Sequence, residues 1–154
     1  MSSPRIRIAC SVAAVLTLVL DAGKGGIAVL VARAAVGEDA AQLAGLAAFA
    51  GHIYPVYLKF HGGKGVATFL GTLPALAWPV GLLTCASWLI VALVSRYSSL
   101  SALIAAAISP LFMLYTGHGT MMALGVILTT LIYLRHWENI TRLKAGTETK
   151  IGKK

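Results

Sequence analysis

The chain has 154 residues, of which 58% are hydrophobic and only 12% are charged, with a formal net charge of +8. A soluble domain carries roughly 25% charged residues, so this composition leaves too little polar surface to cover a globule in water. It excludes an ordinary soluble domain and indicates an integral membrane protein.

Apolar segments separated by short Gly, Pro or charged breaks predict an all-α, polytopic membrane helix bundle with about six transmembrane segments. In chain order they cover about residues 8–36, 42–58, 66–78, 80–94, 98–116 and 120–134. The third is short for a span and ends in a proline-containing stretch, which favours a half-helix or tilted segment packed inside the bundle. No internal repeat divides the chain. We therefore expect one integral membrane domain over 1–154, with a short basic cytoplasmic tail at about 136–154.

The first apolar segment carries two charges inside it. Its basic start, Arg5 and Arg7, could open a signal peptide, but the internal charges and the lack of a clear cleavage site favour a retained span. Ionisable side chains at membrane depth are costly and are usually paired or functional. Asp21 and Lys24 stand at i and i+3, which favours a mutual ion pair packed against the bundle.

The two cysteines, Cys10 and Cys85, lie in apolar runs toward opposite faces of the membrane. We expect both to be small buried hydrophobic residues rather than a disulfide or a metal pair. Nothing in the sequence calls for a metal or an organic cofactor.

The basic residues predict the orientation. If the N-terminus is cytoplasmic and every segment crosses, all 13 Lys and Arg residues except Lys24 and Arg33 lie at the inner face. Glu38 and Asp39 then lie at the outer face. Both termini are expected in the cytoplasm, and the inner face would attract anionic lipid headgroups. Because topology accounts for the net charge, we do not expect nucleic acid as a partner.

The first inner connection predicts a place for a phosphate. Gly62, Gly63 and Gly65 leave the backbone free to approach a ligand and to turn its N–H groups inward. Lys64 adds a positive charge, and the following segment would present a helix N-terminus. It is not a Walker A loop, because Gly65 follows the lysine and no strand precedes it. A flexible basic turn that only obeys the positive-inside rule is an equal alternative.

The second inner connection, residues 95–101, combines an arginine with several hydroxyl groups. These groups could donate hydrogen bonds to an oxyanion, Arg96 with two donors at once. For this segment alone a simpler interpretation is favoured, in which Ser98 or Ser99 caps a helix and Arg96 is a topology charge.

The tail after residue 134 predicts a third contribution to the inner face. If the last span continues as a helix, His136, Asn139 and Leu143 lie on one face at i, i+3 and i+7. The imidazole and the amide would then project toward one inner-face site. A solvated basic helix beside the membrane explains the tail alone about as well.

Five motifs in order carry a family resemblance. They are Asp21-x-x-Lys24-Gly25, Gly51-His52-x-x-Pro55, Phe60-x-Gly62-Gly63-Lys64-Gly65-Val66-Ala67-Thr68, Arg96-Tyr97-x-Ser99-Leu100 and His136-x-x-Asn139-Ile140-x-Arg142-Leu143-x-x-Gly146-x-Glu148. Each is weak alone, but together they resemble the bacterial acyl-phosphate:glycerol-3-phosphate acyltransferases, the PlsY family. The similarity runs from about Ala13 to the tail.

The resemblance implies an enzyme of phospholipid biosynthesis in the bacterial cytoplasmic (inner) membrane, with its site facing the cytoplasm. It would move a fatty acyl group from acyl phosphate to the sn-1 hydroxyl of glycerol 3-phosphate, giving lysophosphatidate and phosphate. Such a donor has a good leaving group, so positioning and charge neutralisation suffice and no strong nucleophile–base pair is needed. None is apparent in the sequence. No His-x-x-x-x-Asp pair occurs either, which argues against acyltransferases that use that dyad.

Residue by residue, the resemblance implies two groups of site positions. Catalytic roles fall to Lys64, Ser99, His136 and Asn139. Substrate or phosphate binding falls to Gly51, His52, Gly62, Gly63, Gly65, Thr68, Arg96, Arg142 and Glu148.

Members of the family begin with a further span and a Gly-Ser-Gly-Asn loop, which supplies a Ser and an Arg to the site. The sequence given has no such motif, so we expect it to lack that piece, and whether the chain alone is active is left open, as is homo-oligomer formation. Two other functions remain alternatives. One is a small transporter or channel subunit for an anionic solute, and the other is an inactive truncated member of the family.

Overall fold

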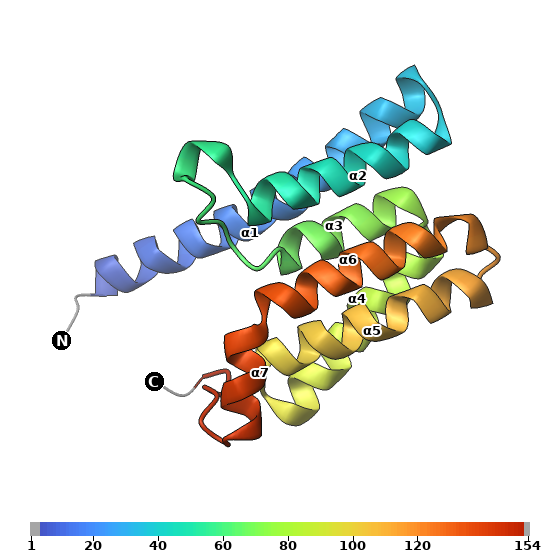
Figure 1. The fold of residues 1–154 in the computed structure, drawn as a ribbon. Coiled ribbons are helices and arrows are strands. Elements are labelled where there is room, and N and C mark those ends of the chain that lie inside the picture. Colours follow the sequence, from blue (N-terminus) through green and yellow to red (C-terminus); the bar gives the residue numbers. More distant parts are fainter. Residues whose placement is uncertain (1–3, 153–154) are drawn as a thin grey trace.

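The computed structural model describes the backbone of residues 4–152 and the side chains from Val12 onward, and this part of the chain is helical without strands (Figure 1). In chain order the helices are α1 (Pro4–Ala35), α2 (Glu38–Ile53), the 3-10 helix η1 (Val56–Leu58), α3 (Val66–Leu76), α4 (Trp78–Ser95), α5 (Ser98–Tyr115), the 3-10 helix η2 (Gly119–Met121), α6 (Met122–Arg135) and α7 (Trp137–Lys144). The expected all-α membrane helix bundle is confirmed.

Judged by helix length and composition, fewer helices could span a membrane than the six segments that the sequence predicts. Among the described residues, three helices are long and apolar enough to cross a membrane alone: α1 over Val12–Ala35, α4 and α5. The segments Gly119–Arg135 and Trp137–Lys144 pass the same test only as a pair, which is bent by 63°. Helix α2 has 16 residues and α3 has 11, fewer than the ~20 that a span needs. The expected count of about six is therefore not confirmed, although helices α1 to α6 reverse direction in turn (Figure 1).

Helix α2 occupies Glu38–Ile53 and not the predicted 42–58. It starts earlier because Glu38 and Asp39 in its first turn interact favourably with the N-terminal end of the helix dipole. It ends earlier because Pro55 disfavours a helical conformation at the residue before it. The buried side of α2 follows a four-residue spacing: Ala41, Gly45, Phe49 and Ile53.

The short third segment is α3, which packs against α1, α2 and α4. It comes close to its neighbours at two glycines. A side chain at Gly71 would clash with the backbone of Ala22 in α1, and one at Gly81 in α4 would clash with Pro74 of α3. Small residues at such crossings let membrane helices approach closely and gain dispersion energy. The bundle interior around α3 therefore depends on the missing Cβ atoms.

The C-terminal end of α3 is closed by Arg33 of α1. Its guanidinium donates to the carbonyl oxygens of Ala75 and Leu76, the second at 2.8 Å, and also pairs with Glu38 at 2.7 and 2.9 Å. The last carbonyls of a helix have no partner within the helix and need one from outside. Arg33 thus satisfies a helix that ends inside the bundle.

Cys85 of α4 is free and half-buried, with its sulfur 3.6 Å from the carbonyl oxygen of Leu70 in α3. It was expected to be buried. The side chain of Cys10 lies outside the described residues.

Replacing Gly71 by alanine tests the close crossing of α1 and α3. We expect Gly71→Ala to lower the free energy of unfolding by about 1–3 kcal/mol, because the new methyl group must push apart two backbones. Thermal unfolding in detergent measures the change. Gly23→Ala in α1 is the matched control, since nothing lies near its added methyl group. Equal midpoints for the two variants would contradict the packing described here.

Candidate active site

The polar connections of the chain gather at one end of the bundle. The loop between α2 and α3, the turn between α4 and α5, and the C-terminal tail all lie at the end where both termini are drawn (Figure 1). The turns between α1 and α2, between α3 and α4, and between α5 and α6 lie at the opposite end. The residues singled out from the sequence therefore belong to one face of the molecule.

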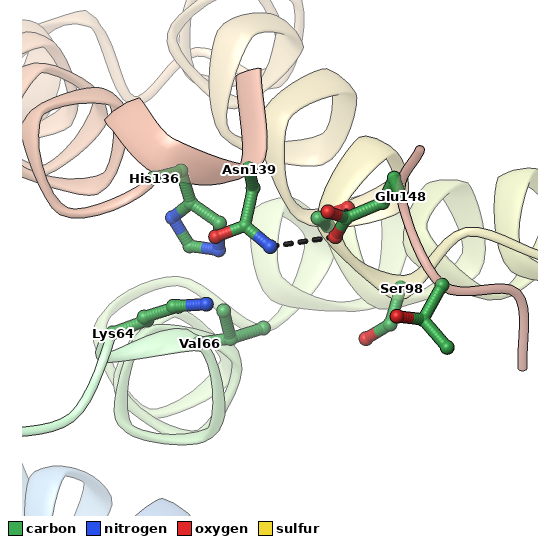
Figure 2. Close-up of a pocket in the computed structure, with 8 residues that line it drawn as sticks. Lys64, Val66, Ser98, His136, Asn139 and Glu148 are labelled. Atoms are coloured by element: carbon green, nitrogen blue, oxygen red, sulfur yellow. Dashed lines mark hydrogen bonds between the residues drawn. The ribbon is translucent and has the colours of Figure 1, made fainter. Parts of the chain in front are cut away.

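A cavity of about 200 Å³ opens at this end between α3, α5 and the tail. Five of the predicted site residues line it: Lys64, Ser99, His136, Asn139 and Glu148. Val66, Ser98 and Thr149 complete its wall. Figure 2 shows the ammonium of Lys64, the imidazole of His136 and the amide of Asn139 converging on the same space. Four segments far apart in the sequence thus build one polar cavity.

Glu148 ties the tail to the bundle. Its carboxylate accepts hydrogen bonds from Ser99 Oγ at 2.7 Å, Asn139 Nδ2 at 2.6 Å and Arg142 Nε at 2.7 Å. Burial by itself would raise the pKa of this carboxyl, but the three hydrogen bonds and the charge of Arg142 outweigh it and lower the pKa to about 2. Glu148 is therefore ionised in the folded protein, and its side chain is only 8% exposed.

Ser99 does not cap a helix, as the simpler interpretation of its segment had it. Helix α5 has no side-chain cap, and the Ser99 hydroxyl donates to Glu148 instead. Asn139 spends its amide N–H on the same carboxylate, while its buried Oδ1 atom has no partner among the described residues. A buried amide oxygen without a partner is costly, so it is available to accept a hydrogen bond from a ligand.

His136 lies where the last span breaks. The sequence interpretation assumed a helix that continues through the tail, but α6 ends at Arg135 and α7 leaves at 63°. In the bent arrangement, Asn139 and Arg142 of α7 both donate hydrogen bonds to Glu148 of the tail. His136 and Asn139 reach the same cavity even so, one from the bend and one from the first turns of α7.

The imidazole of His136 is held in one orientation. Its Nδ1 atom lies 2.8 Å from the carbonyl oxygen of Ile132, and because a carbonyl can only accept, Nδ1 carries the proton. Burial lowers the pKa of His136, and the nearby positive charge of Lys64 acts in the same direction. At neutral pH the ring is therefore uncharged, with Nε2 free to accept a hydrogen bond.

The glycine-rich loop enters α3 through Gly65. This residue has φ +81°, and a side chain there would also clash with the Phe49 ring, so both the backbone and the packing require glycine. Lys64, beside it, is exposed and has no ion-pair partner among the described residues. Its ammonium is free to neutralise an anion.

Several predicted residues support the cavity without lining it. Arg96 donates to the carbonyl of Ile151 at 2.9 Å and accepts from the Ile151 N–H at 2.6 Å through its own carbonyl, which fastens the tail. Arg142 holds Glu148.

Two further predicted residues neither line the cavity nor bind its wall. Thr68 is buried in α3 with its hydroxyl unpaired, and Gly51 lies at the end of α2 with open space around it.

His52 joins the charged pair of α1. The expected ion pair is present, with Lys24 Nζ 2.6 Å from Asp21 Oδ1, and Lys24 Nζ also lies 2.6 Å from His52 Nδ1. A side chain at Gly63 would clash with His52 Nε2, so the ring lies directly against the glycine-rich loop. These three residues connect the first two helices to the loop.

Arg135 was missed as a site residue, because the sequence analysis treated it only as a topology charge. Its guanidinium donates to the carbonyls of Gly62 at 2.9 Å and Gly63 at 3.3 Å, which are 73 and 72 residues away. No local pattern in the sequence signals a contact across that separation. The position of Arg135 directly before His136 was the one hint in the sequence that Arg135 belongs to the site.

No group of three or more His, Cys, Asp or Glu side chains within the described part of the chain could hold a metal ion. The cavity instead offers an ammonium, an uncharged imidazole, an amide and hydroxyl groups. Such a set suits an anion with hydroxyl groups, and its place at the basic end of an apolar helix bundle suits a ligand with a lipid part. The fold and the site therefore define a helical membrane protein with a polar cavity whose groups suit an oxyanion.

Comparison with known proteins gives the family. The family model described as "Glycerol-3-phosphate acyltransferase" matches residues 5–146, and the chain belongs to this family. It is 66% identical over 142 residues to a glycerol-3-phosphate acyltransferase of Cereibacter sphaeroides, which covers 92% of this chain and 68% of that protein. It is 62% identical over 148 residues to one of Jannaschia sp., which covers 96% of this chain and 73% of that protein.

Solved structures agree with this assignment. Two crystal structures of PlsY (YgiH), an integral membrane glycerol 3-phosphate acyltransferase, match with a TM-score of 0.85 and 39% identity. One is the lysophosphatidic acid form and the other the glycerol 3-phosphate form, and the match covers 90% of this chain and 72% and 70% of those chains. The expected enzyme class, an acyltransferase, is confirmed, and the transporter alternative is not favoured.

Glu148→Gln tests the anchoring of the tail. The substitution keeps the shape of the side chain but removes its negative charge. That charge holds Arg142, and it also strengthens the hydrogen bonds from Ser99 and Asn139. We expect the tail to detach, so that trypsin cleaves after Lys150 at least several times faster and acyl transfer falls about tenfold or more. Glu138→Gln is the matched control, since Glu138 is 85% exposed and lies 3.7 Å from the same arginine. Equal effects of the two substitutions would contradict this role for Glu148.

The pH dependence of tail cleavage tests the same contact. Because folding lowers the pKa of Glu148 from 4.5 to about 2, its stabilising contribution is fully present above about pH 4.5. It is lost progressively as the pH falls from there toward 2. The test uses an acid-stable protease and measures by mass spectrometry how fast the chain is cleaved between the end of α7 and Lys150. We expect the tail to be protected from cleavage at higher pH and to lose this protection only below pH 4.5. Loss of protection between pH 7 and 5 would contradict the assignment.

Proposed function

We propose that this chain transfers a fatty acyl group from acyl phosphate to the sn-1 hydroxyl of glycerol 3-phosphate, giving lysophosphatidate and inorganic phosphate. The observation that carries the proposal is the unpaired ammonium of Lys64 in one cavity with the uncharged His136 and the unsatisfied amide oxygen of Asn139. Family membership and the names of the relatives, which are glycerol-3-phosphate acyltransferases, support it.

The groups in the cavity wall support an acyl phosphate as the donor. No thiol or carboxylate in the cavity wall is placed to form a covalent acyl intermediate, since Glu148 is already engaged by three donors. Direct transfer then needs a donor that is already activated. An acyl phosphate is a mixed anhydride whose leaving group is phosphate, and a cationic cavity stabilises the charge that develops on it.

In the proposed reaction the sn-1 hydroxyl oxygen attacks the acyl carbonyl carbon, and the bond from that carbon to the phosphate oxygen breaks. The departing phosphate takes the hydroxyl proton, so no protein base has to be regenerated. Lys64 neutralises phosphate charge. His136 Nε2 and Asn139 Oδ1 accept hydrogen bonds from substrate hydroxyl groups and orient the nucleophile. Ser99 and Arg142 hold Glu148, and Gly62, Gly63 and Gly65 shape the loop around the phosphate.

We place the protein in the bacterial inner membrane with both termini and the site at the cytoplasmic face. The grouping of the loop, the turn at Arg96 and the tail at one end of the bundle supports this orientation (Figure 1). Basic residues concentrate at the cytoplasmic ends of membrane helices. The same face contacts water-soluble glycerol 3-phosphate and the headgroups of anionic lipids.

Lys64→Met tests the proposal directly. We expect lysophosphatidate formation from palmitoyl phosphate and labelled glycerol 3-phosphate to fall by about a hundredfold or more, because the cavity loses its free cation. Lys59→Met is the control, since it removes the same charge from the same loop outside the cavity wall. Palmitoyl-CoA serves as a parallel donor.

Activity of the parent chain with palmitoyl phosphate alone would support the proposed donor. Activity with palmitoyl-CoA alone would overturn the donor assignment. Equal losses in the two lysine variants would overturn the placement of the phosphate at Lys64, because general charge and not the cavity would then control the rate.

A further inference from the structure

We propose that Arg135 is a positioning residue of this enzyme, which turns the peptide groups of the glycine-rich loop so that their N–H donors stay free for a phosphate. This inference rests on the proposed function for its ligand. Arg135 does not line the 200 Å³ cavity, but it lines a second cavity of about 290 Å³ that shares Lys64 with the first.

The guanidinium of Arg135 holds two consecutive peptide groups by their oxygens. Nη2 donates to the carbonyl of Gly62 at 2.9 Å and Nε to the carbonyl of Gly63 at 3.3 Å. The planar fork of arginine presents donors in a fixed geometry that can engage two acceptors at once. The guanidinium also lies over the Tyr54 ring, 5.5 Å from its centre, a cation–π contact that favours one orientation of the fork.

Peptide geometry turns this contact into an orientation of donors. The carbonyl of Gly62 shares its peptide group with the N–H of Gly63, and the carbonyl of Gly63 shares its group with the N–H of Lys64. The described residues contain no cis peptide bond, and in a trans peptide the C=O and N–H point in opposite directions. The N–H groups of Gly63 and Lys64 therefore point away from Arg135.

These two N–H groups are unused. Neither donates a hydrogen bond to any residue that the structure describes. Backbone N–H groups are strong donors that normally find a partner, and successive free N–H groups form sites that suit anions. Together with the free ammonium of Lys64, they make three donors on two adjacent residues.

Glycine makes the loop dependent on an external support. Gly62, Gly63 and Gly65 can adopt many conformations, so the loop by itself would lose much entropy on binding a phosphate. His52 limits the loop at Gly63 by contact, and Arg135 limits it by hydrogen bonds. Arg135 also comes directly before His136, so α6 sets the loop and the imidazole through neighbouring residues.

The test compares Arg135→Gln, Arg135→Lys and Lys144→Gln in the full chain. Lys144 is exposed on α7 and forms no hydrogen bond or ion pair in the described structure, so its replacement removes the same charge from the same end without touching the loop. We expect Arg135→Gln to raise the KM for at least one phosphate-bearing substrate about tenfold, with a smaller change in kcat, because uniform phosphate binding is lost. Arg135→Lys should recover part of the loss, and Lys144→Gln should match the parent chain.

A second measurement does not depend on catalysis. Endoproteinase Lys-C cleavage after Lys64, compared with cleavage after Lys150 in the same chain, reports how firmly the loop is held. We expect Arg135→Gln to accelerate cleavage after Lys64 at least threefold with an unchanged thermal midpoint. If the parent chain shows no acyl transfer, the proposed function fails, and this cleavage ratio still decides the role of Arg135. Unchanged KM values and an unchanged cleavage ratio in Arg135→Gln, or equal effects in Lys144→Gln, would overturn the inference.

Discussion

The buried carboxylate of Glu148 is the interaction on which the site depends. It accepts from Ser99 at the start of α5 and from Asn139 and Arg142 on α7, so one side chain joins the tail to both helices. This end of the bundle is otherwise rich in cations, which would repel one another, and a buried charge is tolerated only with such partners. The carboxylate accepts hydrogen bonds from the Ser99 hydroxyl and the Asn139 N–H. Asn139 Oδ1 and His136 Nε2 then remain free to accept hydrogen bonds from a ligand.

Rigid support of a flexible loop is the second element of the account. The backbone donors that we propose for the phosphate lie on Gly63 and Lys64, in a loop whose glycines allow close approach of a ligand but provide no stiffness. Stiffness comes from the groups that contact the loop, which are His52 with the Lys24–Asp21 pair and Arg135 with Tyr54. Direct acyl transfer from an activated donor relies on positioning more than on a strong base, so this support bears on the rate.

Hydropathy alone located the apolar segments that form helices α1 to α6, although not the number of spans, and the order of the motifs indicated the family, because both signals are local. The predicted start and end of α2 were wrong, since tertiary contacts and Pro55 set them. The expectation of a straight helix through His136 was also wrong. The bend there depends on the contacts between α7 and Glu148, and periodicity does not encode such contacts. Five of the thirteen predicted site residues line the cavity. Arg135 could not be recognised, because its role lies in bonds to carbonyls more than seventy residues away.

The most direct test of the central claim is an experimental structure of this protein with glycerol 3-phosphate bound. The account predicts the ligand in the cavity of Lys64, His136 and Asn139, with its phosphate at the Lys64 ammonium or the loop N–H groups and a hydroxyl group within hydrogen-bond distance of Asn139 Oδ1 or His136 Nε2. A ligand bound instead at the Asp21–Lys24 pair or at Arg33 at the opposite end would contradict it.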